Sequence, residues 1–361
     1  MYEKIIKRMI NESVSIGKDD AVLIHAWEHT LDFASMLALE CMKKGADALI
    51  YVETDSLFKG RLSDLSDEML KTFPKIEFDL VETQTAEFSI TGPKDPAIFK
   101  ELSLEKLPLV GETRRPVEDK FRDKKIPYVG CALGLVTPER AKSYGVDYDA
   151  WLKETLAAMD VSYLEIKDFG KKIAEKLEKA KDVHVTAPGG TDVKFSLAGR
   201  TAYIADGVID AEDIEKGSNT AGLPAGQITV APLETGATGK VVANLPQAIG
   251  GTWMPELEWT FEDGRATGIS AKENFELWKK IYDEGTGDKD RLGTFSIGIN
   301  PKAETGFLID SIVKGVIGIG IGGNQYLGGK NEATGGGNIL LANATVKLDG
   351  ETLLENGKFV L

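Results

Sequence analysis

The sequence predicts an α/β protein in which an N-terminal parallel α/β domain is followed by a mixed, β-rich C-terminal domain. In the first 125 residues, short apolar segments alternate with amphipathic segments of helical period, which is typical of βαβ units and a parallel sheet. From residue 183 onward, segments of alternating apolar and polar residues follow one another between Gly, Asp and Pro turns. The 361 residues suffice for two domains. We expect an α/β domain with a helical connector at 1–182 and a β-rich domain at 183–361.

The expected elements of the N-terminal domain follow from local periodicity. Apolar residues at helical spacing share one face of the first segment, and the second helix should end at Gly45, a residue suited to a left-handed helix cap. The runs AVLIHA, ALIYVE and FDLVE are short and mostly apolar, as buried strands are. We therefore expect a helix over 2–15, a strand over 21–26, a helix from about 30 to 44, and strands over 48–53 and 78–82.

The connector should be helical and the remainder mainly strands. Thr137 followed by Pro138 has the chemistry of a helix start, namely a capping hydroxyl and a proline in the first turn. Two further helices are expected over 147–159 and 164–180, and a single one interrupts the later strands at 271–284. The expected strands are the alternating segments VHVTAP, VKFSLAG, QITVAP, GKVVAN and LEWTFED.

Composition and charge exclude several classes of function. The net charge of −14 argues against nucleic acid and anionic membranes as partners, because both bind basic patches. Two cysteines provide neither a disulfide framework nor a Cys-rich metal cluster. The N-terminal segment lacks the apolar core of a signal peptide, and no stretch is apolar enough to span a membrane. We expect a cytoplasmic protein.

Two motifs invite a catalytic interpretation. His25, Glu28 and His29 match the H-x-x-E-H pattern of one zinc protease class, but His25 closes a strand, so the two histidines need not share a helical face. Ten glycines lie between residues 315 and 337, yet this segment contains neither the P-loop pattern nor the G-x-G-x-x-G spacing. Tight β-turns are the simpler interpretation of these glycines. With three histidines in the chain, no Ser-His-Asp or Cys-His-Asn triad can be argued.

The order of several segments in the second half resembles the aminopeptidase T/aminopeptidase S family of thermophilic metallopeptidases. The resemblance is marked over 126–361 and looser over 1–125. It is carried by the segments 136–160, 187–200, 219–242, 257–269, 292–301, 317–326, 328–338 and 347–359.

The resemblance implies a two-domain protein, usually a dimer, with a two-metal aminopeptidase site in the second domain. Two metals there would activate water and polarise the scissile carbonyl. The ligands would be two Glu, two His, an Asp and a Tyr, and this chain departs from that set at almost every position. Gln227 stands where the family has the Glu of L-P-x-G-E, and Gly293-Thr294 stands where it has a second G-E. Gly318 and Gly336 occupy the positions of its two histidines, and Asn338 that of its Asp. Only the Tyr is matched, by Tyr326. A related branch, resembling iron dioxygenases that open dihydroxypyridine rings, would need two His and an Asp that are also missing here.

We therefore predict an aminopeptidase T-like protein with a substituted metal site. We expect no cofactor, because neutral side chains and glycines do not offset the free-energy cost of dehydrating divalent ions. The former metal cavity should have a non-peptidase role, either binding a small molecule or peptide or performing metal-independent chemistry on a small ligand. The protein is expected to be a homodimer. Two alternatives remain open: a hydrolase that holds Zn, Mn or Co through His25, Glu28 and His29, and a pseudoenzyme kept for partner contacts. The residues expected to line the cavity are Gln227, Thr294, Tyr326, Lys330, Asn331 and Asn338.

Overall fold

The computed structural model describes residues 1–100, 102, 106–215, 217–249 and 251–360. The chain forms two compact units. The first comprises Met1–Tyr163 and Gly207–Pro224, and the second comprises Leu164–Asp206 and Ala225–Leu361. The chain therefore leaves the first unit, returns to it for a short segment and leaves it again.

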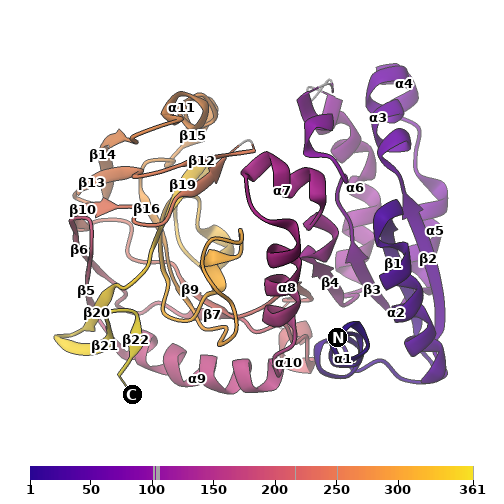
Figure 1. Cartoon of the computed structure of the whole chain (residues 1–361), viewed down its shortest axis with the longest axis horizontal. Coiled ribbons are helices and arrows are strands. Elements are labelled where there is room, and N and C mark those ends of the chain that lie inside the picture. The colour runs from indigo at the N-terminus through magenta and orange to yellow at the C-terminus, as the bar shows by residue number, and fades with distance from the viewer. Residues whose placement is uncertain (101, 103–105, 216, 250, 361) are drawn as a thin grey trace. The chain divides into compact units, whose positions relative to one another are not determined.

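The first unit is built on a parallel five-stranded sheet with the order β2-β1-β3-β4-β8 (Figure 1). This confirms the α/β fold expected for the N-terminal part. The strands are β1 (Ala21–Trp27), β2 (Asp47–Glu53), β3 (Ala86–Ile90), β4 (Tyr128–Cys131) and β8 (Thr220–Leu223). The helices are α1 (Tyr2–Arg8), which continues as a π-helical turn over Met9–Ser13, α2 (Leu31–Lys43), α3 (Asp55–Asp64), α4 (Asp67–Leu70), α5 (Lys75–Thr83), α6 (Leu107–Asp123), α7 (Pro138–Tyr144), α8 (Tyr148–Met159) and α10 (Ala211–Glu215).

Local sequence explains where most of these elements begin and end. Along β1, the buried residues Val22, Ile24 and Ala26 alternate with Leu23 and His25, as a strand with two different faces requires. The Thr137 hydroxyl accepts a hydrogen bond from the Arg140 backbone N–H, and α7 ends at Gly145 in the left-handed conformation. Asp147 caps α8 in the same way through the Ala150 N–H. The predicted starts of both helices are confirmed.

The prediction of a strand over 78–82 is wrong, because these residues lie in α5. Phe78 and Val81 are spaced by one helical turn, and both pack with Val117 and Phe121 of α6 in a small apolar cluster. Helix-to-helix packing therefore overrides the short apolar run. The third strand of the sheet is the next segment, β3.

The second unit is mainly antiparallel, which confirms the β-rich C-terminal part. An eight-stranded sheet has the order β14-β13-β10-β6-β5-β20-β21-β22, and a five-stranded sheet has the order β19-β17-β16-β9-β7 (Figure 1). The eight strands are β5 (Asp182–Ala187), β6 (Thr191–Ser196), β10 (Thr238–Val242), β13 (Glu258–Glu262), β14 (Arg265–Ser270), β20 (Thr345–Leu348), β21 (Glu351–Glu355) and β22 (Lys358–Phe359). The five strands are β7 (Ala202–Ala205), β9 (Gln227–Val230), β16 (Leu292–Gly298), β17 (Ile317–Gly322) and β19 (Gly336–Leu341).

Two small ribbons and two helices complete this unit. The ribbons pair β11 (Gln247–Ile249) with β12 (Thr252–Met254) and β15 (Thr286–Gly287) with β18 (Ala333–Thr334). The helices are α9 (Tyr163–Lys179) and α11 (Phe275–Glu284). The core joins the two large sheets, since the rings of Phe195 in β6 and Phe295 in β16 have centroids 5.2 Å apart. Buried side chains of β9, β16, β17 and β19 extend this core: Ile228, Val230, Ile297, Ile319 and Ile339.

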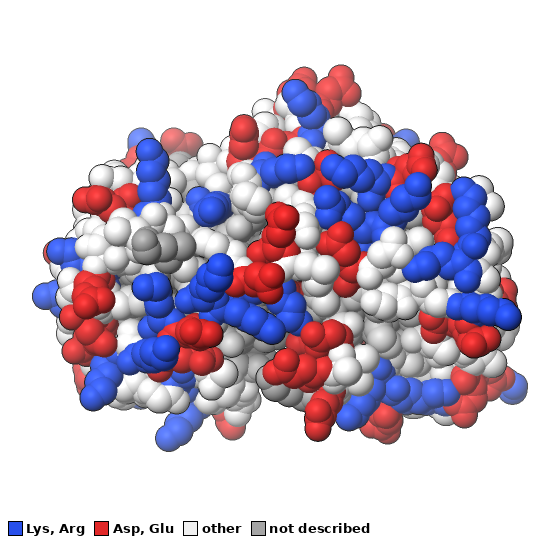
Figure 2. Space-filling model, turned by 90° about the horizontal axis from the view of Figure 1, so that it is seen from below, with Lys and Arg blue, Asp and Glu red and all other residues white. Residues whose placement is uncertain are grey.

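On the face drawn in Figure 2, acidic and basic side chains are interspersed. In the part of the chain that the structure describes, no helix has the length and apolar character needed to cross a membrane.

Candidate functional site

Three of the six residues expected to line a cavity lie on the five-stranded sheet of the second unit. Gln227 begins β9, Thr294 lies in β16 and Asn338 lies in β19. Strand β17 runs between β16 and β19, and it pairs Gly320 with both Thr294 and Asn338. The same side of the sheet also carries Ser296 and Thr229, which pair with each other. We call Gln227, Thr229, Thr294, Ser296 and Asn338 the neutral cluster.

Glycines in β17 let the side chains of the neutral cluster lie over bare backbone. A Cβ atom added to Gly318 would be 2.3 Å from Ser296 Oγ and 3.4 Å from both amide atoms of Asn338. A Cβ atom on Gly320 would be 2.3 Å from Thr294 Oγ1 and 3.3 Å from Asn338 Oδ1. The space next to Gly318, where the family would place a histidine, is therefore occupied by a hydroxyl and an amide.

Hydrogen bonds join three of the five members of the neutral cluster, Gln227, Ser296 and Thr229. Gln227 Nε2 donates to Ser311 O at 3.1 Å and to Ser296 Oγ at 3.4 Å, and Thr229 Oγ1 donates to Gln227 Oε1 at 3.5 Å. Ser296 is buried, whereas Gln227, Thr229 and Thr294 are half-buried and Asn338 is exposed. Sequence reasoning missed Ser296 and Thr229. Strand alternation was the available signal, because residues two apart on β9 and β16 share a face. The cluster contains donors and acceptors but no ionisable side chain.

The backbone at Gly336 excludes a side chain. Its φ of +138° is one that residues with a Cβ rarely adopt, and a Cβ there would be 2.2 Å from Ile321 O. This is the second position at which the family would place a histidine. Here the obstacle is the backbone of the neighbouring strand, which cannot rotate away as a hydroxyl can.

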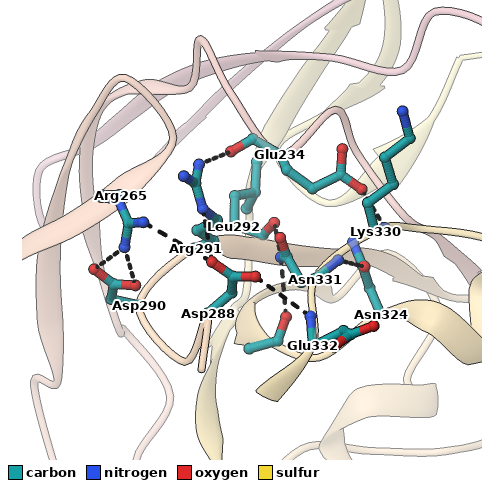
Figure 3. Close-up of polar contacts among 11 residues, drawn as sticks. Glu234, Arg265, Asp288, Asp290, Arg291, Leu292, Asn324, Lys330, Asn331 and Glu332 are labelled. Atoms are coloured by element: carbon teal, nitrogen blue, oxygen red, sulfur yellow. Dashed lines mark hydrogen bonds and ion pairs between the residues drawn. The ribbon is translucent and has the colours of Figure 1, made fainter. Parts of the chain in front are cut away.

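Asn331 anchors the Gly-rich loop between β17 and β19. It is 1% exposed, and its Nδ2 donates to Leu292 O at 2.9 Å and Gly322 O at 3.0 Å. Its backbone N–H donates to Asn324 Oδ1 (Figure 3). Asn324 Nδ2 in turn donates to Gly293 O. The two amides therefore fasten the loop to the start of β16 and the end of β17. Those are the strands that carry Thr294 and the bare glycines.

Lys330 and Tyr326 lie in the same loop, apart from the neutral cluster. The Lys330 backbone N–H donates to Glu234 Oε1 at 2.7 Å, and Glu234 also forms an ion pair of 2.6 Å with Arg200 (Figure 3 draws Glu234 and Lys330). Burial alone would raise the pKa of Glu234, but the hydrogen bond from Lys330 N–H and the charge of Arg200 hold it below its ordinary value. Tyr326 belongs to a 3-10 turn over Gln325–Leu327 and is 77% exposed.

The structure does not bring His25, Glu28 and His29 together as a metal site. His25 lines one pocket of the first unit and His29 another, and Glu28 is exposed. His29 Nε2 lies 2.9 Å from Gly134 O, so this nitrogen carries the proton and donates to the carbonyl. Across the described residues of both units, no three His, Cys, Asp or Glu side chains are grouped so that they could hold a metal ion. Their donor set does not fit the two metals that the family resemblance implies.

The environment of His25 predicts a measurable pH dependence of stability. Burial, followed by the nearby charges of Arg114 and Arg61, lowers the pKa of His25 from 6.5 to about 4. The pKa of His25 is lower in the folded state than in the unfolded state. The stabilising contribution of neutral His25 is therefore complete above pH 6.5 and is lost as the pH falls toward 4. We expect the wild type to lose about 1–2 kcal/mol more than His25→Phe between pH 7 and pH 5 in urea unfolding. Equal losses in the two proteins would contradict the assigned environment.

Comparisons with known proteins agree with this fold. The family model described as thermophilic metalloprotease (M29) matches residues 2–308. Among solved structures, wild-type AmpT from Thermus thermophilus is similar over 100% of this chain and 99% of its own, with a TM-score of 0.77 and 20% identity. The 2,5-dihydroxypyridine dioxygenase of Pseudomonas putida KT2440 is similar over 99% of this chain and 96% of its own, with a TM-score of 0.62 and 13% identity. No curated protein sequence matches the chain.

Proposed function

The chain belongs to the thermophilic metalloprotease (M29) family, and from this premise we propose that it is a member that binds a small polar ligand without the family's two-metal chemistry. The proposed site is the neutral cluster on the five-stranded sheet of the second unit. The ligand would be an uncharged molecule that exchanges hydrogen bonds with the amides of Gln227 and Asn338 and the hydroxyl of Thr294.

The observation that supports this proposal most directly is the chemistry of the neutral cluster. Amide and hydroxyl groups offer both donors and acceptors, so they suit a neutral polar ligand. Divalent metals at a catalytic site need carboxylates or imidazoles, and the cluster contains neither. A general base for hydrolysis is also missing from these five residues.

The glycine positions add independent support. A protein that had lost two histidines by drift would be expected to keep a backbone that tolerates other side chains there. Instead Gly336 has a φ of +138° and a neighbouring carbonyl where its Cβ would lie. Ser296 and Asn338 fill the space beside Gly318. The backbone and the side chains around these positions are thus adapted to glycine.

The metal content of the purified protein tests the first half of the proposal. After incubation with Zn²⁺, Mn²⁺ or Co²⁺ and removal of excess ions, we expect no stoichiometric metal by mass spectrometry. Cleavage of a leucyl anilide should stay at the background rate and be unaffected by a chelator. AmpT treated in the same way is the positive control. Stoichiometric metal together with chelator-sensitive cleavage would overturn the proposal.

Ligand screening tests the second half. We expect a thermal-shift screen of uncharged polyols and amides to yield compounds that stabilise the wild type, and Gln227→Leu should abolish their effect. Gln247→Leu is the matched control, because Gln247 is half-buried in the same unit but lies in the β11–β12 ribbon. Stabilisation that survives in Gln227→Leu, or that is lost equally in both variants, would place the ligand elsewhere.

A further inference from the structure

A cleft in the first unit is separate from the neutral cluster and has a different chemistry. It has a volume of about 270 Å³ and lies between one face of the parallel sheet and helices α5 and α6. Two rows of paired residues cross that face. One row contains Leu23, Glu87 and Tyr128, and the next contains His25 and Tyr51. Apolar residues of the two helices, among them Leu80, Val81 and Val117, form the opposite wall.

Two polar atoms of this cleft are buried without a hydrogen-bond partner among the residues that the structure describes. They are Nε2 of His25 and Oε1 of Gln84. The amide nitrogen of Gln84 is occupied, since it donates to Glu87 Oε2 at 3.0 Å. A buried polar atom without a hydrogen-bond partner is destabilising, so both atoms favour a molecule that brings a complementary hydrogen-bonding group into the cleft.

Aromatic rings flank the same space on two sides. The rings of His25 and Tyr51 have centroids 4.8 Å apart, and those of Phe121 and Tyr128 have centroids 6.3 Å apart with an edge-on arrangement. Aromatic pairs of this geometry attract a further flat ring through its faces and edges. A water molecule takes up about 30 Å³ in the liquid. The cleft, at about 270 Å³, is several times larger and has room for a bicyclic ring system.

The charges around the cleft do not favour an ion. Arg114 of α6 is paired with Glu77 of α5 at 3.0 Å, so its charge is already balanced at the rim. Glu87 on the sheet has a pKa raised by burial, and His25 is uncharged near neutral pH because its pKa is about 4. A charged ligand would lose its hydration in the cleft, where Arg114 is already paired and burial disfavours the charged forms of Glu87 and His25. Glu118, the other acidic residue of the lining, is exposed.

We propose that this cleft is a binding site for a small, flat, uncharged aromatic molecule that carries an N–H or O–H donor. The donor bonds to Gln84 Oε1, His25 Nε2 lies within the same pocket for a second polar group, and the ring packs between the two aromatic pairs. The site is independent of the metal chemistry and of the neutral cluster, because every residue that lines it belongs to the first unit.

A matched pair of probes tests the proposal on the full-length protein. Indole and benzofuran have nearly the same shape, but only indole has an N–H donor. By isothermal titration calorimetry and ligand-observed NMR, we expect indole to bind about three- to tenfold more tightly than benzofuran, which corresponds to one neutral hydrogen bond. Benzoate and benzylamine, as an anionic and a cationic ring, should bind more weakly than indole.

Variants identify the site of binding. Leu80→Trp fills the cleft and should abolish binding, whereas Leu57→Trp places the same residue on exposed α3 of the same unit and should leave binding unchanged. Gln84→Leu should keep ring binding and remove the preference for indole, which gives a second readout if Leu80→Trp fails to fold. The proposal would be overturned by absence of indole binding, equal affinities for indole and benzofuran, tighter binding of a charged probe, or indole binding that survives in folded Leu80→Trp. None of these outcomes depends on the metal content that tests the proposed function.

Discussion

Replacing Gly336 by histidine should destabilise the second unit by about 3 kcal/mol or more, without creating a metal ligand. The new Cβ would meet Ile321 O at 2.2 Å, and the φ of +138° is unfavourable for any residue with a side chain. Both problems are backbone problems, because the φ is that of β19 itself and Ile321 O belongs to the paired strand β17, where Gly322 lies opposite Gly336. Relief would require the edge strand β19 to shift.

The matched control for this prediction is Gly328→His. Gly328 also has a positive φ, of +75°, but a Cβ there would meet no atom within 4 Å. We expect this control to cost about 1 kcal/mol, the penalty of the backbone conformation alone. Urea unfolding of the wild type and both variants gives the comparison. A Gly336→His protein as stable as the control, or one that binds zinc stoichiometrically, would show that β19 tolerates a ligand at this position.

Replacing Asn331 by leucine should cost about 3 kcal/mol and loosen the Gly-rich loop. The substitution keeps the approximate size of the side chain but removes the Nδ2 donor, so the buried carbonyls of Leu292 and Gly322 each lose a hydrogen bond. The backbone N–H of residue 331, which donates to Asn324 Oδ1, remains in the variant, so the expected loss comes from the Nδ2 bonds alone. We expect a lower urea midpoint and faster proteolysis between residues 323 and 335.

The control lies in the same loop. Gln325 Nε2 donates to Glu332 Oε1 at 2.9 Å, but this bond is exposed. Gln325→Leu should therefore change the free energy of unfolding by about 0.5 kcal/mol or less. Similar losses in Asn331→Leu and Gln325→Leu would mean that the buried amide does not anchor the loop.

Periodicity predicted those elements whose signal is local. Strand β1 and helix α7 are examples, since an apolar run marks the first, and a capping threonine followed by proline marks the second. The strands β4 and β8 were not anticipated. Each is four residues long, and β8 pairs with β4 from about ninety positions away, so its place depends on a partner that local reasoning does not consider. The error at 78–82 has the same origin, because packing between α5 and α6 decides the structure there.

For the candidate site, the family resemblance directed attention to three residues that the structure places on one sheet, but not to every residue of the neutral cluster. Gln227, Thr294 and Asn338 stand where the family would place ligands, and the structure puts them on one sheet. Ser296 does not align with a family ligand, and only strand pairing reveals it beside Gly318. The sequence alone gives no reason to assign different roles to Asn331 and Asn338. Only the fold distinguishes the buried loop anchor from the exposed member of the cluster.

The return of the chain to the first unit has a consequence for biosynthesis. Strand β8 is the edge of the first sheet, but it is encoded after α9 and the strands β5, β6 and β7 of the second unit. A nascent chain that has emerged only to residue 163 therefore exposes β4 as an unpaired edge, which is a template for wrong pairing. The first unit can close only after residue 224 has left the ribosome, when all of α9 and three strands of the second unit are already outside. Folding of the two units must overlap in time during synthesis, and a gene fragment that stops at the end of α8 should yield an aggregation-prone product.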